Sequence, residues 1–492
     1  MNQSRPRIGI VGAGISGLVA ALLLAHRGAP VILAEAAATP GGRIATHPLD
    51  GVPVPIGPAL LTLRPIFARI FAEAGTRLDD HLQLTPQTHL GRHIFADGSR
   101  LDLPLAAEEA AAAIGRFAGA SAIPGFRAFR TRAEATFETL DATMLSRERP
   151  TALGLAAGAG VGRLLATGPF TPLWDVLGSL FPDPRLRQLF GRTAAYVGTS
   201  PLQAPASLML VAAVEQAGGW FIAGGLARLI AVLADLARAA GAEIRLNAQV
   251  ADIALAGGRV AGLTLADGET LPCERIICTA DPAALAAGRL GPAAARAVDP
   301  LPPARRSFSA IAMPMLGRLP PDAPHQSVLH APDAVGEYAA LALRGRMPAT
   351  PTLTLLALDR VDGAPPPAGE ERLLLLANAP ARGDQGQPDA AAEAAFRQAA
   401  LARLAAAGLD PAPRAEALLG PRAFEARFPG TGGALYGAAV QGWQATFNRP
   451  AARTRLPGLL LAGGGTHPGA GVAMAAASGR LAALAALESL PA

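Results

Sequence analysis

Apolar residues in this chain form short continuous runs that alternate with longer stretches of helical periodicity. Short apolar runs bounded by glycine favour buried strands, whereas apolar positions three or four residues apart favour one face of a helix. The first run, Ile8 to Val11, leads into a helix-like stretch that ends near His26, and a second run covers Val31 to Ala34. This order of strand, helix and strand predicts a βαβ unit with parallel strands.

The same patterns predict the elements of the remaining chain. Helices are expected over 64–75, 226–240, 389–407 and 472–488, and strands over 243–246, 275–279, 352–358, 372–378 and 458–462. A hairpin over 93–103 turns at Asp97-Gly98, and a meander turns at 257–258 and 267–268. Residues 104–220 are mainly helical in this interpretation, and the Pro- and Ala-rich residues 281–305 form a linker. Alternating strands and helices predict an α/β fold.

The turn between the first strand and the first helix carries glycine at three set positions. Gly12 permits a tight turn, Gly14 lets a pyrophosphate approach the backbone, and Gly17 lets helix and strand pack closely. The helix N-terminus at Ser16 offers free N–H groups and a positive dipole end to phosphates. Glu35, at the end of the second strand, is placed to accept hydrogen bonds from ribose hydroxyls, and its charge repels a 2′-phosphate. The motif therefore predicts a dinucleotide of the FAD or NAD type.

A second glycine turn, Gly41-Gly42-Arg43, follows the acid and brings a guanidinium toward the same pyrophosphate. With the first motif, it resembles the opening signature of the FAD-dependent amine oxidase and phytoene desaturase superfamily. The resemblance implies non-covalent FAD as the cofactor, held in a Rossmann-type, GR2-like domain. Gly57 and Pro58 are expected to contact FAD as well, and in the superfamily the residue that matches Val250 meets the adenine through its backbone.

The segment from Leu459 to Arg480 also predicts cofactor contacts. A buried strand, a glycine loop and a helix of small residues let backbone amides approach the flavin ring, and the helix N-terminus favours negative charge on a reduced flavin. Its GTHPG loop resembles that of the phytoene desaturase branch. The residues expected to bind FAD are Gly12, Gly14, Ser16, Gly17, Glu35, Gly42, Arg43, Gly57, Pro58, Val250, Gly463, Gly464, Val472 and Met474.

The nucleotide-type elements are interrupted twice along the chain. Residues 1–80, 221–300 and 430–492 are expected to form one discontinuous FAD-binding domain. Residues 81–220 are expected to form a helical region that binds substrate and contacts a membrane. Residues 301–429 are expected to form an inserted α+β substrate-binding domain.

Composition excludes several classes of function. All 43 basic residues are arginine, so the chain has no lysine and Schiff-base chemistry is excluded. Only 4% of the residues are aromatic, too few for base-stacking platforms, and no nucleic-acid partner is expected. Cys273 and Cys278 match neither zinc nor disulfide spacing and are expected to be buried thiols, and no metal site is predicted.

Hydropathy indicates a large apolar surface. No apolar run is long enough to span a bilayer, and the N-terminus leads into a strand without signal-peptide features, so a cytoplasmic location is expected. The mean hydropathy of +0.30 nevertheless indicates either an apolar cavity or contact with a membrane. Phe170, Trp174 and Phe181, beside Arg185, suit an interfacial segment over 170–187, and an ordinary core helix is the alternative. Peripheral association with the inner membrane is the expectation.

Three further segments resemble one subgroup of the phytoene desaturase branch: GRTAAYVGTSPLQAPA (191–206), ERLLLLANAP (371–380) and FPGTGGALYG (428–437). They resemble the 1-hydroxycarotenoid 3,4-desaturases of purple bacteria. The resemblance implies introduction of the 3,4 double bond into acyclic carotenoids that carry a 1-hydroxyl or 1-methoxyl group. Residues 325–330, HQSVLH, depart from the HNV-F pattern of the subgroup, so end-group recognition is not carried over to this loop.

In this interpretation a hydride passes from an allylic C–H bond to flavin N5, and the polyene cation then loses a proton from the neighbouring carbon. His467, in the loop nearest the expected flavin, and Glu215 are the candidate bases; a loop hydrogen bond or a helix cap is the alternative role for each. The chain contains one complete GxGxxG motif. A quinone or oxygen, rather than a nicotinamide, is therefore the expected electron acceptor.

Other functions share parts of this pattern. An amine oxidase would share both glycine motifs but normally adds an active-site lysine and an aromatic cage, and this chain has three Tyr and three Trp. A phytoene desaturase differs only in its substrate, and a carotenoid isomerase differs only in the absence of net oxidation. A non-enzymatic GDI- or escort-type binding protein would keep the architecture without the cofactor, and the intact glycines argue against it.

Overall fold

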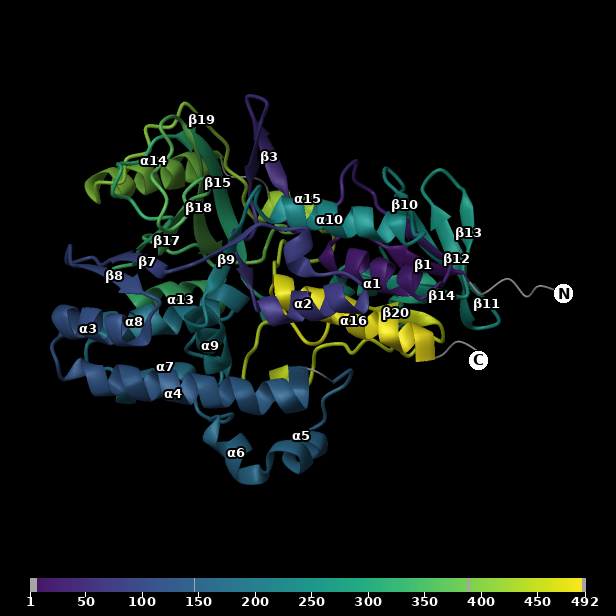
Figure 1. The fold of residues 1–492 in the computed structure, drawn as a ribbon, viewed down its shortest axis with the longest axis horizontal. Helices are drawn as coiled ribbons and strands as arrows, with labels where there is room; N and C mark the ends of the chain where they lie inside the picture. The colour runs from purple at the N-terminus through teal and green to yellow at the C-terminus, as the bar shows by residue number, and fades with distance from the viewer. Residues whose placement is uncertain (1–6, 146, 387–389, 489–492) are drawn as a thin grey trace.

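The computed structural model describes residues 7–145, 147–386 and 390–488. Its first sheet is parallel throughout, with the strand order β10-β2-β1-β14-β20. These strands are β1 Ile8–Val11, β2 Val31–Ala34, β10 Glu243–Arg245, β14 Arg275–Cys278 and β20 Leu459–Leu461. All five were expected from the sequence, and they bring three distant parts of the chain side by side (Figure 1).

Helices cover one face of this sheet. They are α1 Ile15–His26, α2 Arg64–Glu73, α10 Leu226–Ala239 and α16 Val472–Glu488. Every residue of α1 from Ile15 to Ala25 is buried, as expected of a helix that is apolar on all sides. A Cβ on Gly479 of α16 would lie 2.2 Å from the carbonyl oxygen of Ser16, so the small residues of α16 allow the close helix packing that the sequence predicted.

The other face of the sheet packs against the antiparallel meander β11 Val250–Ala256, β12 Arg259–Leu265 and β13 Thr270–Pro272. The prediction of a linker over 281–305 is wrong, because this segment contains the helices α11 Pro282–Ala286 and α12 Pro292–Ala295. Both helices begin with proline, whose missing N–H costs no hydrogen bond in the first turn. Asp281 caps α11 by accepting a hydrogen bond from the Ala283 N–H at 3.1 Å.

A second, larger sheet has the strand order β19-β15-β18-β17-β16-β7-β8 and is antiparallel except where β16 meets β7. Its strands are β7 His89–Ile94, β8 Arg100–Pro104, β15 Ser309–Gly317, β16 Gln326–Leu329, β17 Leu353–Ala357, β18 Glu371–Ala379 and β19 Ala415–Glu416. The predicted hairpin turn is confirmed, since the Gly98 N–H donates to the Phe95 carbonyl at 3.0 Å. Helices α13 Ala334–Ala342 and α14 Ala390–Ala406 accompany this sheet; Asp389, the predicted start of α14, lies outside the described residues.

Several strands are not predicted by the hydrophobic pattern. They include β15, β16, the hairpin β3 Thr46–Leu49 with β4 Val52–Pro55, and the small sheet of β5 Leu61–Thr62, β6 Leu84–Pro86 and β9 Gly219–Ile222. Strand β15 is buried at every position, so it lacks alternation, and its Pro314 normally argues against a strand. Pro314 is tolerated beside the short edge strand β19, which pairs only with Met315 and Leu316.

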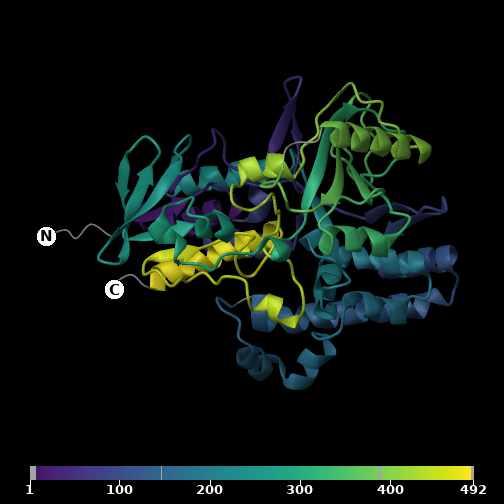
Figure 2. The same ribbon diagram turned by 180° about the vertical axis from the view of Figure 1, so that it is seen from behind.

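The region between β8 and β9 is helical, as predicted. Its helices are α3 Ala107–Ala118, α4 Ala122–Leu140, α5 Ala152–Ala159, α6 Val161–Ala166, α7 Leu173–Leu180, α8 Pro184–Gly191 and α9 Leu210–Gln216, and the 3₁₀ turn η3 Arg192–Val197 follows α8. Leu173, Leu177 and Phe181 are at most 1% exposed. Helix α7 is therefore a core helix and not the interfacial helix that the sequence also allowed. Figures 1 and 2 show α5 and α6 beneath α4, at the edge of the molecule. Among the described helices, none is long and apolar enough to cross a membrane.

Candidate functional site

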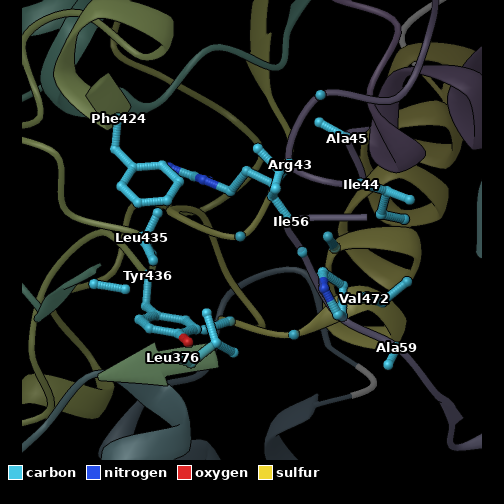
Figure 3. Close-up of a pocket in the computed structure, with 18 of the residues that line it drawn as sticks. Arg43, Ile44, Ala45, Ile56, Ala59, Leu376, Phe424, Leu435, Tyr436 and Val472 are labelled. Carbon is cyan, nitrogen blue, oxygen red and sulfur yellow. The ribbon is translucent and has the colours of Figure 1, made fainter. Parts of the chain in front are cut away.

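A cavity of about 720 Å³ lies between the carboxyl ends of the parallel strands and the second sheet. The ends of β1 and β2 and the starts of α1 and α16 form one side, and β17, β18 and the residues around α15 Pro421–Arg427 form the other. Figure 3 shows Val472 and Ala59 on one side of this space and Phe424, Leu435 and Tyr436 on the opposite side. Ligands of open α/β sheets bind at the carboxyl ends of the strands, so this cavity is the candidate site.

The loop after β1 forms a backbone cradle at the N-terminus of α1. Gly12 has a φ of +97°, which L side chains rarely adopt, and a Cβ on Gly17 would lie 2.0 Å from the Gly12 carbonyl oxygen. A Cβ on Gly14 would instead lie 3.9 Å from its nearest neighbour, the Cα of Gly42. The fold therefore requires Gly12 and Gly17, whereas Gly14 keeps the space before the helix N-terminus clear. Such a cradle fits an anionic diphosphate.

Glu35 stands at the end of β2, on the cavity wall. Its Oε2 accepts a hydrogen bond from the Ala13 N–H at 2.7 Å, and its Oε1 accepts one from the Ala37 N–H at 2.9 Å. These bonds fix the carboxylate beside the glycine cradle and leave lone pairs for other donors. The position fits the predicted contact with ribose hydroxyls.

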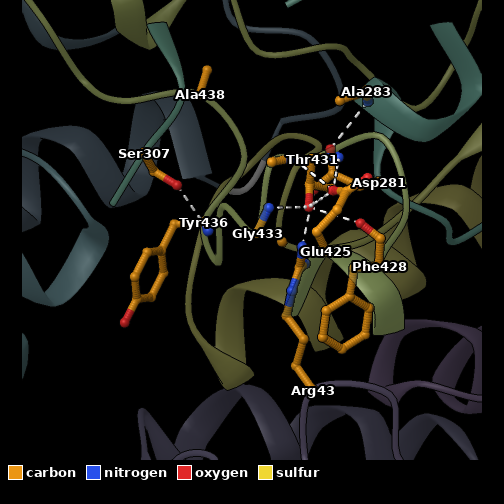
Figure 4. Close-up of polar contacts among 12 residues, drawn as sticks. Arg43, Asp281, Ala283, Ser307, Glu425, Phe428, Thr431, Gly433, Tyr436 and Ala438 are labelled. Atoms are coloured by element: carbon orange, nitrogen blue, oxygen red, sulfur yellow. Dashed lines mark hydrogen bonds and ion pairs between the residues drawn. The ribbon is translucent and has the colours of Figure 1, made fainter. Parts of the chain in front are cut away.

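Arg43 lies on the same wall, after the second glycine turn. Its Nη2 forms an ion pair with Asp281 at 3.0 Å, and its guanidinium lies 5.1 Å from the centre of the Phe428 ring (Figure 4). The Nε–H of Arg43 is buried and has no hydrogen-bond partner among the described residues. A buried donor without a partner costs free energy, so this N–H fits an acceptor supplied by a bound cofactor. A Cβ on Gly57 would lie 2.5 Å from the Arg43 carbonyl oxygen, which explains the glycine there.

Most residues predicted to bind FAD lie on the cavity wall: Gly12, Gly14, Ser16, Glu35, Gly42, Arg43, Gly57, Pro58, Gly463, Gly464 and Val472. Gly17, Val250 and Met474 do not line it. Gly17 supports the turn from behind, and Met474 packs against the core of the parallel sheet and its helices. Val250 begins β11, two residues after Ala248, whose N–H donates to the Glu35 carbonyl at 2.8 Å. The cofactor contacts of all these residues stay predictions.

His467 lies beside the cavity but not on its wall. The imidazole is 3% exposed, and its Nε2 lies 3.1 Å from the Met144 carbonyl oxygen. Burial lowers the pKa of His467, so the ring is neutral and Nε2–H is the donor in this bond. This geometry matches the loop hydrogen bond that the sequence left as the alternative. A role as base stays a prediction that the position does not favour.

Glu215 in α9 lies behind Tyr196, which lines the cavity from η3. The Tyr196 hydroxyl donates to Glu215 Oε1 at 2.8 Å. Burial raises the pKa of Glu215, and Arg192 opposes this shift. Glu215 therefore reaches the cavity only through the phenol, and sequence reasoning did not identify Tyr196 or Arg192 as wall residues.

Two other polar residues of the site were also missed. Asp281 is the third residue after the end of β14, and an acid just beyond the carboxyl end of a predicted parallel strand was a usable signal. No sequence pattern marks Arg449, because its partners are backbone carbonyls of loops, and such contacts do not depend on the residue types of those loops. Its Nη1 donates to the Gly464 carbonyl at 2.9 Å and its Nη2 to the Tyr436 carbonyl at 3.1 Å. Burial lowers the pKa of Arg449 to about 10, which still leaves it charged at neutral pH.

The loop that carries Tyr436 is braced by the carboxylate of Glu425. Glu425 accepts hydrogen bonds from the backbone N–H groups of Gly430, Thr431 and Gly432, at 2.7, 3.0 and 2.7 Å. The Tyr436 N–H donates to Ser307 Oγ at 3.0 Å (Figure 4). The aromatic wall opposite α16 is thus fixed by polar contacts on its outer side.

Known proteins match this chain along nearly its whole length. The family described as flavin containing amine oxidoreductase matches residues 15–487. The chain belongs to this family. Because the family contains flavin and the βαβ motif is of the dinucleotide type, the cofactor is FAD and the protein is a flavin-dependent oxidoreductase. The non-enzymatic alternative is thereby set aside.

Individual relatives are similar over comparable lengths. The chain is 41% identical to a hydroxyneurosporene desaturase of Rubrivivax gelatinosus over 486 residues, which cover 97% of this chain and 92% of that protein. It is 42% identical to a hydroxyneurosporene desaturase of Cereibacter sphaeroides over 495 residues, covering 100% and 99%. The cyclohexylamine oxidase structure from Brevibacterium oxydans shares the fold with a TM-score of 0.59 and 18% identity, covering 98% and 99%.

Proposed function

We propose that this flavoenzyme desaturates acyclic carotenoids and introduces the 3,4 double bond into substrates that carry a 1-hydroxyl or 1-methoxyl group. The observation that carries the proposal is 41% and 42% identity, over nearly the full chain, to two hydroxyneurosporene desaturases. The cavity supports it, because the glycine cradle and a long apolar wall border the same space.

The wall opposite the cradle suits a polyene. Its side chains beyond Arg43 are mainly aliphatic or aromatic: Ile56, Leu356, Leu358, Leu376, Phe424 and Leu435. Burial of each CH₂-sized unit contributes about 0.8 kcal/mol, so a long hydrocarbon gains most of its binding free energy from such a wall. A small amine would leave this surface unused.

The absence of lysine argues against amine oxidation, since all 43 basic residues are arginine. A carotenoid isomerase would share the site, and net oxidation of the substrate distinguishes the two reactions. Incubation with 1-hydroxyneurosporene, followed by pigment analysis, tests the proposal. One added double bond is expected with this substrate, and colourless phytoene should remain unchanged.

Bound FAD supplies the hydride acceptor for the reaction. The chain's own residues enclose the substrate and exclude water, and the oxidised polyene must release a proton to an acceptor. Neither predicted base, His467 nor Glu215, lines the cavity. The polyene cation that remains after hydride transfer loses a proton readily, so a weak proton acceptor is sufficient. The roles of His467 and Glu215 as bases stay predictions. A quinone or oxygen is our proposal for the electron acceptor, because a second complete GxGxxG motif is absent from the sequence.

We further propose that the enzyme collects its substrate at an anionic membrane surface through α5, α6 and the residues next to them. Leu153, Val161, Leu165 and Phe170 are 82%, 61%, 55% and 66% exposed. Phe170 contacts Trp443, itself 42% exposed, with the ring centroids 5.7 Å apart. We call these five residues the α5–α6 surface.

Charge around the α5–α6 surface supports an anionic bilayer. Residues 150–174 contain no acid, and Arg163 is their only charged residue. Arg147, Arg149 and Arg163 are exposed beside the apolar side chains. Exposed apolar residues flanked by arginine favour the boundary between headgroups and acyl chains.

Leu165→Glu is expected to weaken co-sedimentation with anionic liposomes at least tenfold, since one buried Leu contributes about 1.5–3 kcal/mol. FAD content should not change. Leu343→Glu, at the residue after α13, is the matched control, because Leu343 is also highly exposed, at 65%, but lies outside the α5–α6 surface. Equal effects of the two substitutions would contradict the assignment.

A further inference from the structure

A second group of polar side chains lies on the cavity wall, apart from those at the glycine cradle. Arg192 and Tyr196 come from η3, Gln326 from β16, Tyr338 from α13 and Thr354 from β17. Tyr338 packs in one cluster with Ala195 of η3. The Gln326 side chain donates to the Leu90 carbonyl at 3.0 Å and borders the same cavity. We call this part of the wall the polar pole.

The polar pole contains a fixed chain of hydrogen bonds. Arg192 donates to the Tyr196 hydroxyl, and that hydroxyl donates to Glu215 Oε1 at 2.8 Å. The Arg192 guanidinium also lies 4.6 Å from the centre of the Tyr196 ring. The phenol oxygen therefore has its own proton committed to Glu215, and toward a ligand it acts as an acceptor.

A hydrocarbon cannot use these groups. Arg192 is 6% exposed, so its charge is largely removed from water, and it borders the cavity together with the phenol. A polyene packed against them would leave buried polar atoms without partners, which is costly. An alcohol oxygen resolves the mismatch, because it accepts from the guanidinium and donates to the phenol oxygen.

We propose that the polar pole binds the oxygenated end of the substrate, with Arg192 donating to the end-group oxygen and the Tyr196 phenol oxygen accepting a hydrogen bond from the end-group hydroxyl. Glu215 is a positioning residue that orients the phenol. The inference rests on the proposed function, because it supposes a substrate with a 1-hydroxyl or 1-methoxyl group. Gln326 belongs to the 325–330 segment that departs from the subgroup pattern, so this segment borders the polar pole although its usual residues are absent.

A 1-hydroxyl and a 1-methoxyl group would form different hydrogen bonds with the polar pole. A hydroxyl can accept from Arg192 and donate to Tyr196, whereas a methoxyl can only accept. Removal of the phenol oxygen should therefore affect the alcohol and spare the ether. This difference separates recognition of the end group from a general role in packing.

The test compares Tyr196→Phe with the unmodified holoenzyme on 1-hydroxyneurosporene and on its 1-methoxy ether. kcat/KM for the alcohol should fall about tenfold, the effect of one lost hydrogen bond, while kcat/KM for the ether stays within about twofold. The Kd values of the two pigments, measured by quenching of flavin fluorescence, should change in the same way. Glu215→Gln keeps an acceptor for the phenol and should retain the unmodified preference.

Equal losses on both pigments, or no loss on the alcohol, would overturn the inference. FAD content and the thermal unfolding temperature of each variant show whether the fold is intact. If the unmodified enzyme converts neither oxygenated pigment, the proposed function itself fails. If it converts both and Tyr196→Phe leaves their ratio unchanged, only the role of the polar pole fails.

Discussion

Gly14→Val is expected to give a folded protein that contains no FAD. Gly14 has a φ of −69°, which any residue adopts, and a Cβ there would meet no described protein atom closer than 3.9 Å. The isopropyl group would instead enter the space at the N-terminus of α1, where we expect the pyrophosphate. Overlap of this kind costs up to about 3 kcal/mol, or about 100-fold in affinity. The ratio of flavin absorbance to protein absorbance in the purified variant measures the effect.

Gly17→Val provides the contrasting control. Its Cβ would lie 2.0 Å from the Gly12 carbonyl oxygen, so this substitution should prevent native packing of α1 and not merely empty the site. Circular dichroism separates the two outcomes, since Gly14→Val should retain the helical signal and Gly17→Val should not. A folded Gly14→Val protein with stoichiometric FAD would place the cofactor elsewhere.

Glu371→Leu is expected to lower the free energy of unfolding by about 3–5 kcal/mol. Glu371 is 1% exposed and pairs with Arg360, which is 6% exposed, through bonds of 2.6 and 2.7 Å. Arg360 also donates to the carbonyls of Pro320 and Leu319, at 2.9 and 3.1 Å. Removal of the carboxylate would leave a buried cation without its counter-charge at the start of β18. Urea unfolding of the holoprotein measures the loss.

The neighbouring Glu370 supplies a matched control for this pair. Glu370 also makes two hydrogen bonds to one arginine, Arg414, but the side chains are 37% and 54% exposed. Surface ion pairs contribute little, so Glu370→Leu should leave the urea midpoint nearly unchanged. Similar urea midpoints for the two variants would mean that the buried Arg360–Glu371 pair contributes no more to the free energy of unfolding than the exposed pair does.

The nucleotide-binding elements were predictable because their signals are local. In β1, α1 and β2, the apolar runs, the glycine turn and the terminal acid lie within one short stretch, and each residue type has a single physical reason. The same holds for β20 and α16, where small residues mark the contact of Gly479 with Ser16. Local signals of this kind do not depend on the remainder of the fold.

The second sheet and the polar pole depend on contacts that are distant in sequence. Strand β15 is buried throughout and contains a proline, so neither alternation nor composition marks it as a strand. Glu215 is an acid in the short helix α9, and only its contact with Tyr196 connects it to the cavity. The apolar residues of α7 suit an interfacial helix as well as a core helix, and only the packing of Leu173 and Leu177 distinguishes the two.

We propose that FAD in this cavity oxidises an acyclic carotenoid with an oxygenated end. The most direct test of this proposal is the flavin absorbance of the holoenzyme in liposomes that contain 1-hydroxyneurosporene, without oxygen. We expect the flavin band to bleach and one double bond to be gained per flavin reduced, and we expect a quinone analogue, but not NAD, to restore the band. Bleaching by phytoene with no response to 1-hydroxyneurosporene would contradict it.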